Sequence, residues 1–127
     1  MGATTDRSAT WAPYSDERRF TAQRWYIEGE RVLNSVVGMI ETRRAVQRRS
    51  HDEVHLEHLL AGIEFIEISK VIAARAGSIP PAAVRTLDAI HLATALSLQP
   101  GLEAFVTYDD RLAEAARALG LPVVSPA

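Results

Sequence analysis

Several acidic residues of this sequence lie within or directly after apolar segments, where a carboxylate would be partly buried. Asp88 lies in the segment 85–96, whose apolar residues would cover every side of a helix. A helix of that kind is buried, and a carboxylate within it needs a hydrogen-bond partner, a counter-ion or a metal. Asp88 is therefore a candidate metal ligand, with the N-cap of a helix beginning at Ala89 as the alternative.

Three further acidic residues, Asp109, Asp110 and Glu41, have similar alternatives. Asp109 and Asp110 follow the apolar run 104–107, which predicts a strand, and the carboxyl end of a strand is where open α/β sheets place ligands. One of the two is expected to cap the helix that follows. Glu41 lies inside a predicted helix with Arg44 one turn later, so it is a candidate ligand or half of a surface ion pair.

The absence of certain residues and motifs excludes several classes of catalytic and binding site. There is no cysteine, and there is no GxxxxGK[ST], GxGxxG or GxSxG motif, which excludes thiolate sites, Gly-rich phosphate loops and a serine elbow. His51, His55 and His58 share a helix face opposite a leucine stripe, so we expect them in solvent, whereas His91 is expected to be a packed core histidine. Carboxylates without thiols suit Mg²⁺ or Mn²⁺.

Length and composition indicate one globular domain, residues 1–127. The chain is 47% apolar and 24% charged, which argues against disorder and coiled coil. No apolar run or leader segment predicts membrane insertion or export, so the cytoplasm is the expected compartment. A net charge of -2 argues against wrapping duplex DNA by charge alone. A nuclease stays open, because a basic rim can offset an acidic centre.

Arginine supplies almost all of the positive charge. Lysine occurs once, at Lys70, so thirteen of the 14 basic residues are arginines, the densest group being Arg43, Arg44, Arg48 and Arg49. A compositional bias toward arginine and a solvated helix face explain this group. The alternative is a rim that contacts phosphate or a partner.

Hydrophobic periodicity predicts alternating strands and helices. We expect strands over 31–34, 65–68, 104–107 and 122–125, with a weaker one over 2–5, and helices over 15–29, 36–49, 50–63, 69–76, 85–98 and 110–119. Short apolar strands that do not alternate are typical of a parallel sheet covered on both faces. The expected fold class is therefore α/β, a three-layer α/β/α domain with a short-stranded parallel sheet.

Five segments of the chain resemble a known family. Residues 85–95, RTLDAIHLATA, with 105–116, FVTYDDRLAEAA, and 120–123, GLPV, closely resemble the C-terminal half of PIN-domain toxins of the VapC type. Residues 35–49 are similar to the family segment that carries a glutamate ahead of an arginine-rich helix end. At the N-terminus, residues 6–9, DRSA, resemble the family's Asp-Thr-Ser-Ala motif, with Arg7 in place of the threonine and the polar run 2–5 in place of an apolar strand.

This resemblance implies a site of four acids in a PIN-like fold. Asp6, Glu41, Asp88 and Asp109 match the acids that bind one or two Mg²⁺ or Mn²⁺ ions in the family, with Asp110 as the alternative to Asp109. Asp6 and Asp88 are expected to be direct ligands, and Glu41 and Asp109 to act directly or through water. Clustered carboxylates cannot all ionise without a cation, which agrees with that assignment.

The activity that the resemblance implies is metal-dependent cleavage of RNA by the toxin of a type II toxin–antitoxin pair. The implied partners are a cognate VapB-type antitoxin, the RNA substrate and a second copy of the chain in a homodimer. Ser8 and Thr107 would orient carboxylates.

Two other functions are alternatives to this one. Because the first strand is polar, the alternative is a PIN-like protein that has lost cleavage and binds an antitoxin or RNA. A response-regulator receiver also has an α/β fold, but it needs a lysine after a late strand, and Lys70 begins a mid-chain helix.

Overall fold

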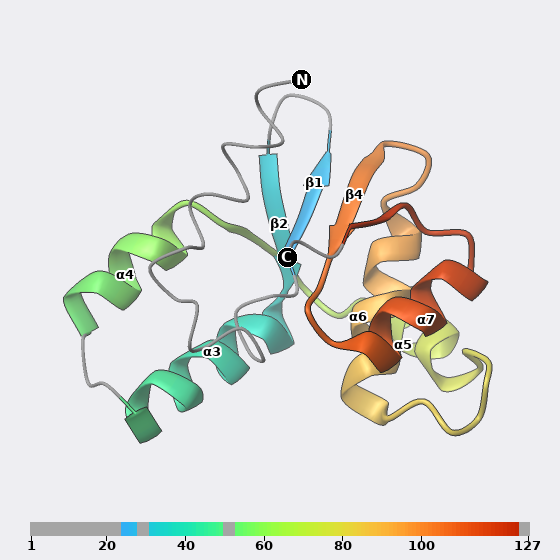
Figure 1. The fold of residues 1–127 in the computed structure, drawn as a ribbon, viewed down its shortest axis with the longest axis horizontal. Helices are drawn as coiled ribbons and strands as arrows, with labels where there is room; N and C mark the ends of the chain where they lie inside the picture. The colour runs from blue at the N-terminus through green and yellow to red at the C-terminus, as the bar shows by residue number, and fades with distance from the viewer. Residues whose placement is uncertain (1–23, 28–30, 50–52, 125–127) are drawn as a thin grey trace.

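The computed structural model of this chain describes residues 24–27, 31–49 and 53–124 (Figure 1). The described elements, in order, are β1 (Arg24–Ile27), β2 (Arg31–Ser35), α3 (Val36–Arg49), α4 (Glu53–Ala61), β3 (Glu64–Ile66), α5 (Lys70–Gly77), α6 (Thr86–Ser97), β4 (Leu102–Val106), α7 (Asp110–Ala118) and β5 (Val123–Val124). Strands and helices alternate from β2 onward, as the periodicity predicted. None of the described helices is both long enough and apolar enough to cross a membrane.

The described strands form one sheet in the order β3-β2-β1-β4-β5. β2 pairs parallel with β3, and β4 pairs parallel with β5. β1 lies at the centre and runs antiparallel to both of its neighbours. The α/β fold class is confirmed, but the sheet is parallel only outside its central strand.

β1 corrects one predicted helix. The expected helix over 15–29 is wrong at Arg24–Ile27, which pairs with β2 in the register Trp25↔Leu33 and with β4 in the register Trp25↔Phe105. Aromatic and β-branched residues favour strands, and pairing on both sides outweighs a weak helical periodicity. The rest of that helix and the expected strand over 2–5 lie outside the described residues.

Apolar side chains cover both faces of the sheet, because successive side chains of a strand point in opposite directions. Leu33 of β2 and Phe105 of β4 pack into the main core with α5, α6 and α7. On the opposite face, Phe65 of β3 lies in register with Asn34 and packs against residues of α3 and α4. The predicted three-layer arrangement is therefore present, with α3 and α4 on one side of the sheet and α5–α7 on the other (Figure 1).

Local signals set the helix ends. Ser69 caps α5, its side chain accepting a hydrogen bond from the Ile72 N–H at 3.1 Å. Gly120 follows α7 with a φ of 83°, a left-handed conformation that glycine adopts without the penalty of a Cβ. Ser69 therefore sets the start of α5, and Gly120 sets the end of α7 before β5.

The junction between β2 and α3 is tightly built. The Asn34 side-chain oxygen accepts from the Ser35 N–H at 2.8 Å, and the Ser35 hydroxyl accepts from the Val37 N–H at 3.0 Å. Both Asn34 and Ser35 are buried. A Cβ added at Gly38 would lie 2.5 Å from the Asn34 side chain, so the first turn of α3 packs this closely only because residue 38 is glycine.

We expect Gly38→Ala to lower the free energy of unfolding by about 1–3 kcal/mol, because the new methyl group overlaps a buried, hydrogen-bonded side chain. Gly77→Ala is the matched control, since a Cβ there meets no atom within 4 Å. Alanine at the end of α5 should leave stability unchanged or raise it by up to about 1 kcal/mol. Urea unfolding followed by circular dichroism measures both, and a Gly38→Ala variant as stable as wild type would contradict the tight junction.

Candidate active site

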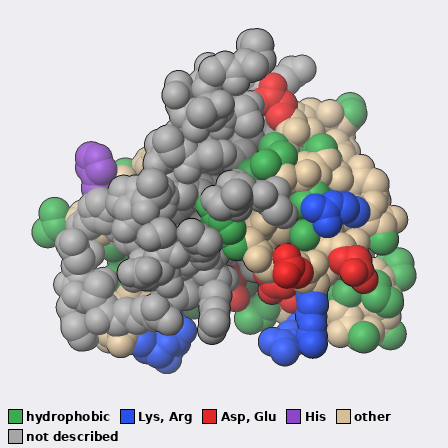
Figure 2. Space-filling view, in the orientation of Figure 1, with side chains coloured by type: hydrophobic (Ala, Val, Ile, Leu, Met, Phe, Trp, Pro, Cys, Tyr) green, Lys and Arg blue, Asp and Glu red, His purple; other side chains and the backbone are tan. Residues whose placement is uncertain are grey.

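The predicted acids that the structure describes lie near the carboxyl ends of β2 and β4. Glu41 is in the second turn of α3, directly after β2, and Asp109 follows β4. Asp88 is in the first turn of α6 and lines one pocket with Asp109 and Asp110. Figure 2 shows acidic and basic side chains side by side on this part of the surface. Asp6 lies outside the described residues.

Asp88 is a half-buried carboxylate in an apolar helix. Its helix begins at Thr86 with Arg85 as N-cap, so the capping alternative for Asp88 is wrong. Among the described residues, none donates a hydrogen bond to it or pairs with it. Burial raises the pKa of Asp88, and the nearby negative charge of Asp109 raises it further. Such a carboxylate gains from a neighbouring cation.

Asp109 is the N-cap of α7, which confirms the expectation that one of the paired aspartates caps a helix. Its Oδ1 accepts from the Arg111 N–H at 2.9 Å and from the Leu112 N–H at 3.1 Å. The Asp109 N–H donates to Oγ1 of the buried Thr107 at 3.0 Å. Thr107 thus orients the backbone of Asp109, and the capping bonds occupy Oδ1 alone.

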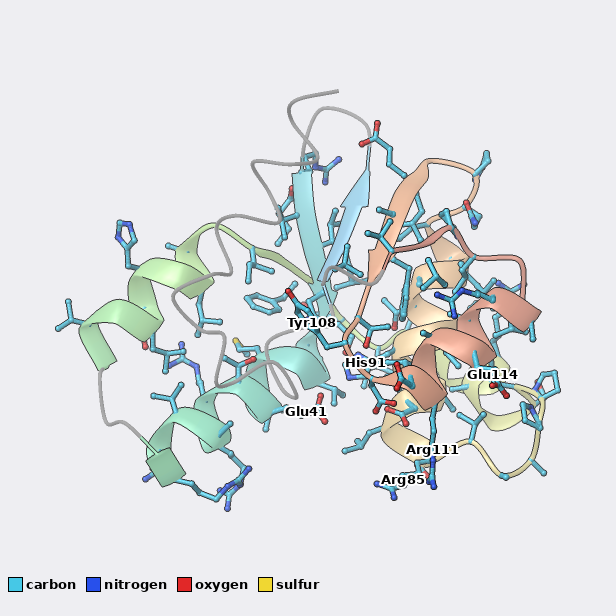
Figure 3. All side chains as sticks on the ribbon, viewed as in Figure 1. Glu41, Arg85, His91, Tyr108, Arg111 and Glu114 are labelled. Atoms are coloured by element: carbon cyan, nitrogen blue, oxygen red, sulfur yellow. The ribbon has the colours of Figure 1, made fainter. Side chains whose placement is uncertain are left out.

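Glu41 bonds across the site to His91. The His91 Nε2 lies 2.8 Å from the Glu41 Oε1, and the histidine side chain is 0% exposed while that of Glu41 is 32% exposed. An ionised carboxylate only accepts, so Nε2 carries the proton. His91 is the buried core histidine that was predicted, and it also ties α3 to α6 (Figure 3).

The Glu41–His91 pair was missed by sequence reasoning. The surface ion pair with Arg44 is wrong, because Glu41 faces His91 instead. The two residues are 50 positions apart, and only the spacing of His91 one turn after Asp88 hinted at a place in the site. Arg85 and Arg111, which line the pocket beside the aspartates, were also not singled out.

The donor atoms around Asp88 fit a hard cation in their chemistry. They are carboxylate oxygens, which suit Mg²⁺ or Mn²⁺ better than Zn²⁺. Within the described residues, no group of three His, Asp or Glu side chains is placed to hold a single ion. Asp6, the remaining predicted ligand, lies outside that part of the chain. His58 is exposed, as expected.

Comparison with known proteins identifies the family. Residues 4–118 match the model of the PIN domain, a range that includes Asp6. The chain therefore belongs to the PIN-domain family, as the resemblance implied.

Two relatives from Mycobacterium tuberculosis are similar over most of the chain. Ribonuclease VapC35 is 40% identical over 126 residues, covering 96% of this chain and 84% of that protein. Ribonuclease VapC47 is 37% identical over 101 residues, covering 78% of this chain and 74% of that protein. No solved structure matches.

We expect Asp88→Asn to raise the Tm at pH 7 in metal-free buffer. The pKa of Asp88 is raised in the folded state, so its ionisation destabilises the fold. Protonation removes that penalty as the pH falls through the folded pKa. The difference in Tm should therefore be fully present above the folded pKa and disappear below the unfolded value of about 3.9.

Thermal unfolding across this pH range measures the effect. Asp110→Asn is the matched control, because it removes a charge from the same pocket at an exposed position and should change the Tm little. If Asp88→Asn and wild type melt alike at pH 7 without metal, the half-buried carboxylate does not destabilise the fold.

Proposed function

We propose that this protein is a metal-dependent endoribonuclease that acts in the cytoplasm as the toxin of a type II toxin–antitoxin pair. Membership of the PIN-domain family and similarity to proteins named ribonuclease VapC support the ribonuclease activity. The observation that carries the metal dependence is Asp88, half-buried beside Asp109 and without a partner among the described residues. A carboxylate kept in that state serves a site that takes a cation.

In this proposal, Asp6 and Asp88 hold Mg²⁺ or Mn²⁺, and Glu41 and Asp109 contribute directly or through water. The bound metal would lower the pKa of a water molecule and offset the charge that develops on the phosphate. The capping bonds to Oδ1 of Asp109 hold its carboxylate at the amino end of α7. His91 holds the Glu41 carboxylate toward α6.

The partners follow from the same proposal. A VapB-type antitoxin would silence the enzyme by covering the pocket that Asp88, Asp109 and Asp110 line. A second copy of the chain would form a homodimer, by analogy with the family.

We expect RNA cleavage in the presence of Mg²⁺ or Mn²⁺ and its complete loss in excess EDTA. Asp88→Asn and Asp6→Asn should each lower cleavage more than about 100-fold and weaken metal binding to a similar degree, because each removes one ligand charge. Glu103→Gln, near the opposite end of β4 from Asp109, is the charge-matched control and should cleave normally. A cleavage assay and calorimetric metal titration give the two readouts.

The outcomes separate the alternatives. If Asp6→Asn behaves like wild type while Asp88→Asn is inactive, the site uses Glu41, Asp88 and Asp109 without the first acid. A folded wild-type protein that binds RNA or antitoxin but cleaves no RNA with either metal would favour the non-cleaving binding module. Full activity in EDTA would remove the metal mechanism.

We expect His91→Leu to lower kcat about 10–100-fold with little change in KM, because Glu41 loses the donor that orients it. His91→Gln places an amide N–H near the position of Nε2 and should keep most of the wild-type kcat. Circular dichroism and Tm for both variants report on folding. Equal losses of kcat in the two variants, in step with their Tm, would mean that His91 only packs the core.

A further inference from the structure

Two arginines lie beside the acidic pocket, and the positive charge of Arg85 partly opposes the rise in the pKa of Asp88. Arg85 and Arg111 are exposed and line the same pocket as Asp88, Asp109 and Asp110. Figure 3 shows both arginine side chains at one edge of the molecule, below the amino end of α7. Despite the neighbouring carboxylates, neither forms an ion pair within the described residues. Their guanidinium groups are therefore available to another anion.

Two other arginines in the described residues, Arg31 and Arg43, are paired with glutamates. The Arg31 guanidinium contacts both Glu64 carboxylate oxygens, at 2.6 and 2.7 Å. Arg43 contacts both oxygens of Glu57, at 2.5 and 3.2 Å. Arginine readily makes such two-pronged bonds to a carboxylate when geometry permits. Arg85 and Arg111 line a pocket with three aspartates, yet neither makes a two-pronged bond of this kind within the described residues.

Local helix stability does not account for the two pocket arginines. Arg85 is the N-cap of α6 and makes no capping hydrogen bond through its side chain, and Arg111 is the second residue of α7. The amino end of a helix carries partial positive charge, so a cation there is disfavoured. Both positions thus place an arginine where its own helix gains nothing from the charge, and both helices begin at the same pocket.

The ligand that fits is a strand carrying phosphates. Clustered carboxylates repel a phosphodiester, and two guanidinium groups at the rim would offset that repulsion while leaving the acids to hold a cation. A planar guanidinium matches the oxygens of a phosphate group. Contacts of this kind fix the position of a strand without reading its bases.

We propose that Arg85 and Arg111 bind backbone phosphates of a single RNA strand and so hold it across the acidic pocket. This inference rests on the proposed ribonuclease activity and assigns the residues that position its substrate. Binding through them is independent of base sequence. It makes KM, more than kcat, depend on the two side chains and on salt.

The test uses cleavage of a short single-stranded RNA over a range of salt concentrations. Arg85→Gln and Arg111→Gln should each raise KM about 5- to 10-fold, with kcat nearly unchanged, as expected for the loss of one solvent-exposed hydrogen bond. Each variant should also lower the slope of log kcat/KM against log salt by about 0.7, and the double variant by about 1.4. Arg75→Gln on α5 is the matched control, because Arg75 is exposed and does not line this pocket.

Binding of the same RNA to Asp88→Asn, with and without the arginine substitutions, gives a second readout by fluorescence anisotropy. If wild type cleaves while the arginine variants keep the wild-type KM and salt slope, the inference is overturned and the proposed function stands. If wild type cleaves nothing, but the arginine substitutions weaken binding and lower its salt slope, the phosphate contacts stand and the ribonuclease proposal fails. Absence of RNA binding by both Asp88→Asn and wild type would overturn both.

Discussion

A carboxylate held half out of water is the constraint around which this protein is organised. Asp88 cannot move into solvent easily, because the next turns of α6 carry fully buried residues, among them Leu92, Ala93 and Ala95. The helix is anchored in the main core between the sheet and α5 and α7. Asp109 then adds negative charge beside a group that burial already disfavours in its charged form. The fold thus holds a site in which a cation is favoured.

Three separate sets of hydrogen bonds position Glu41, Asp109 and His91 near Asp88. The buried Asn34–Ser35 junction, packed closely against Gly38, starts α3 and so places Glu41. The capping bonds of Asp109 start α7 at the end of β4. The Glu41–His91 bond ties α3 to α6 across the sheet edge. Each of these contacts satisfies a backbone or buried polar group. Breaking one would lower the free energy of unfolding, because that group would lose its hydrogen-bond partner.

The charges of the site are arranged in two zones. Asp88, Asp109 and Asp110 line the same pocket as Arg85 and Arg111, and within the described residues neither arginine forms an ion pair with them. Elsewhere on the described surface, Arg31 and Arg43 are held by glutamates. A near-neutral chain can therefore place acidic and basic side chains in one pocket, a local arrangement that its net charge of -2 conceals.

The sequence by itself determined the features that depend on neighbours along the chain. The α6 helix, its single acid at Asp88, the capping role of one of the paired aspartates and the left-handed Gly120 all follow from local periodicity and local hydrogen bonding. The order of strands and helices from β2 onward also follows from local periodicity. The resemblance to the family likewise came from the sequence alone.

Only the tertiary structure decided the features that depend on partners distant in sequence. Arg24–Ile27 is a central antiparallel strand because β2 and β4 pair with it on both sides, which outweighs its weak helical periodicity. Glu41 meets His91 rather than Arg44 because packing of α3 against α6 brings residues 50 positions apart within hydrogen-bond distance. Which arginines are paired and which are free to take a phosphate also depends on contacts across the fold, since a guanidinium pairs only with a carboxylate within its reach.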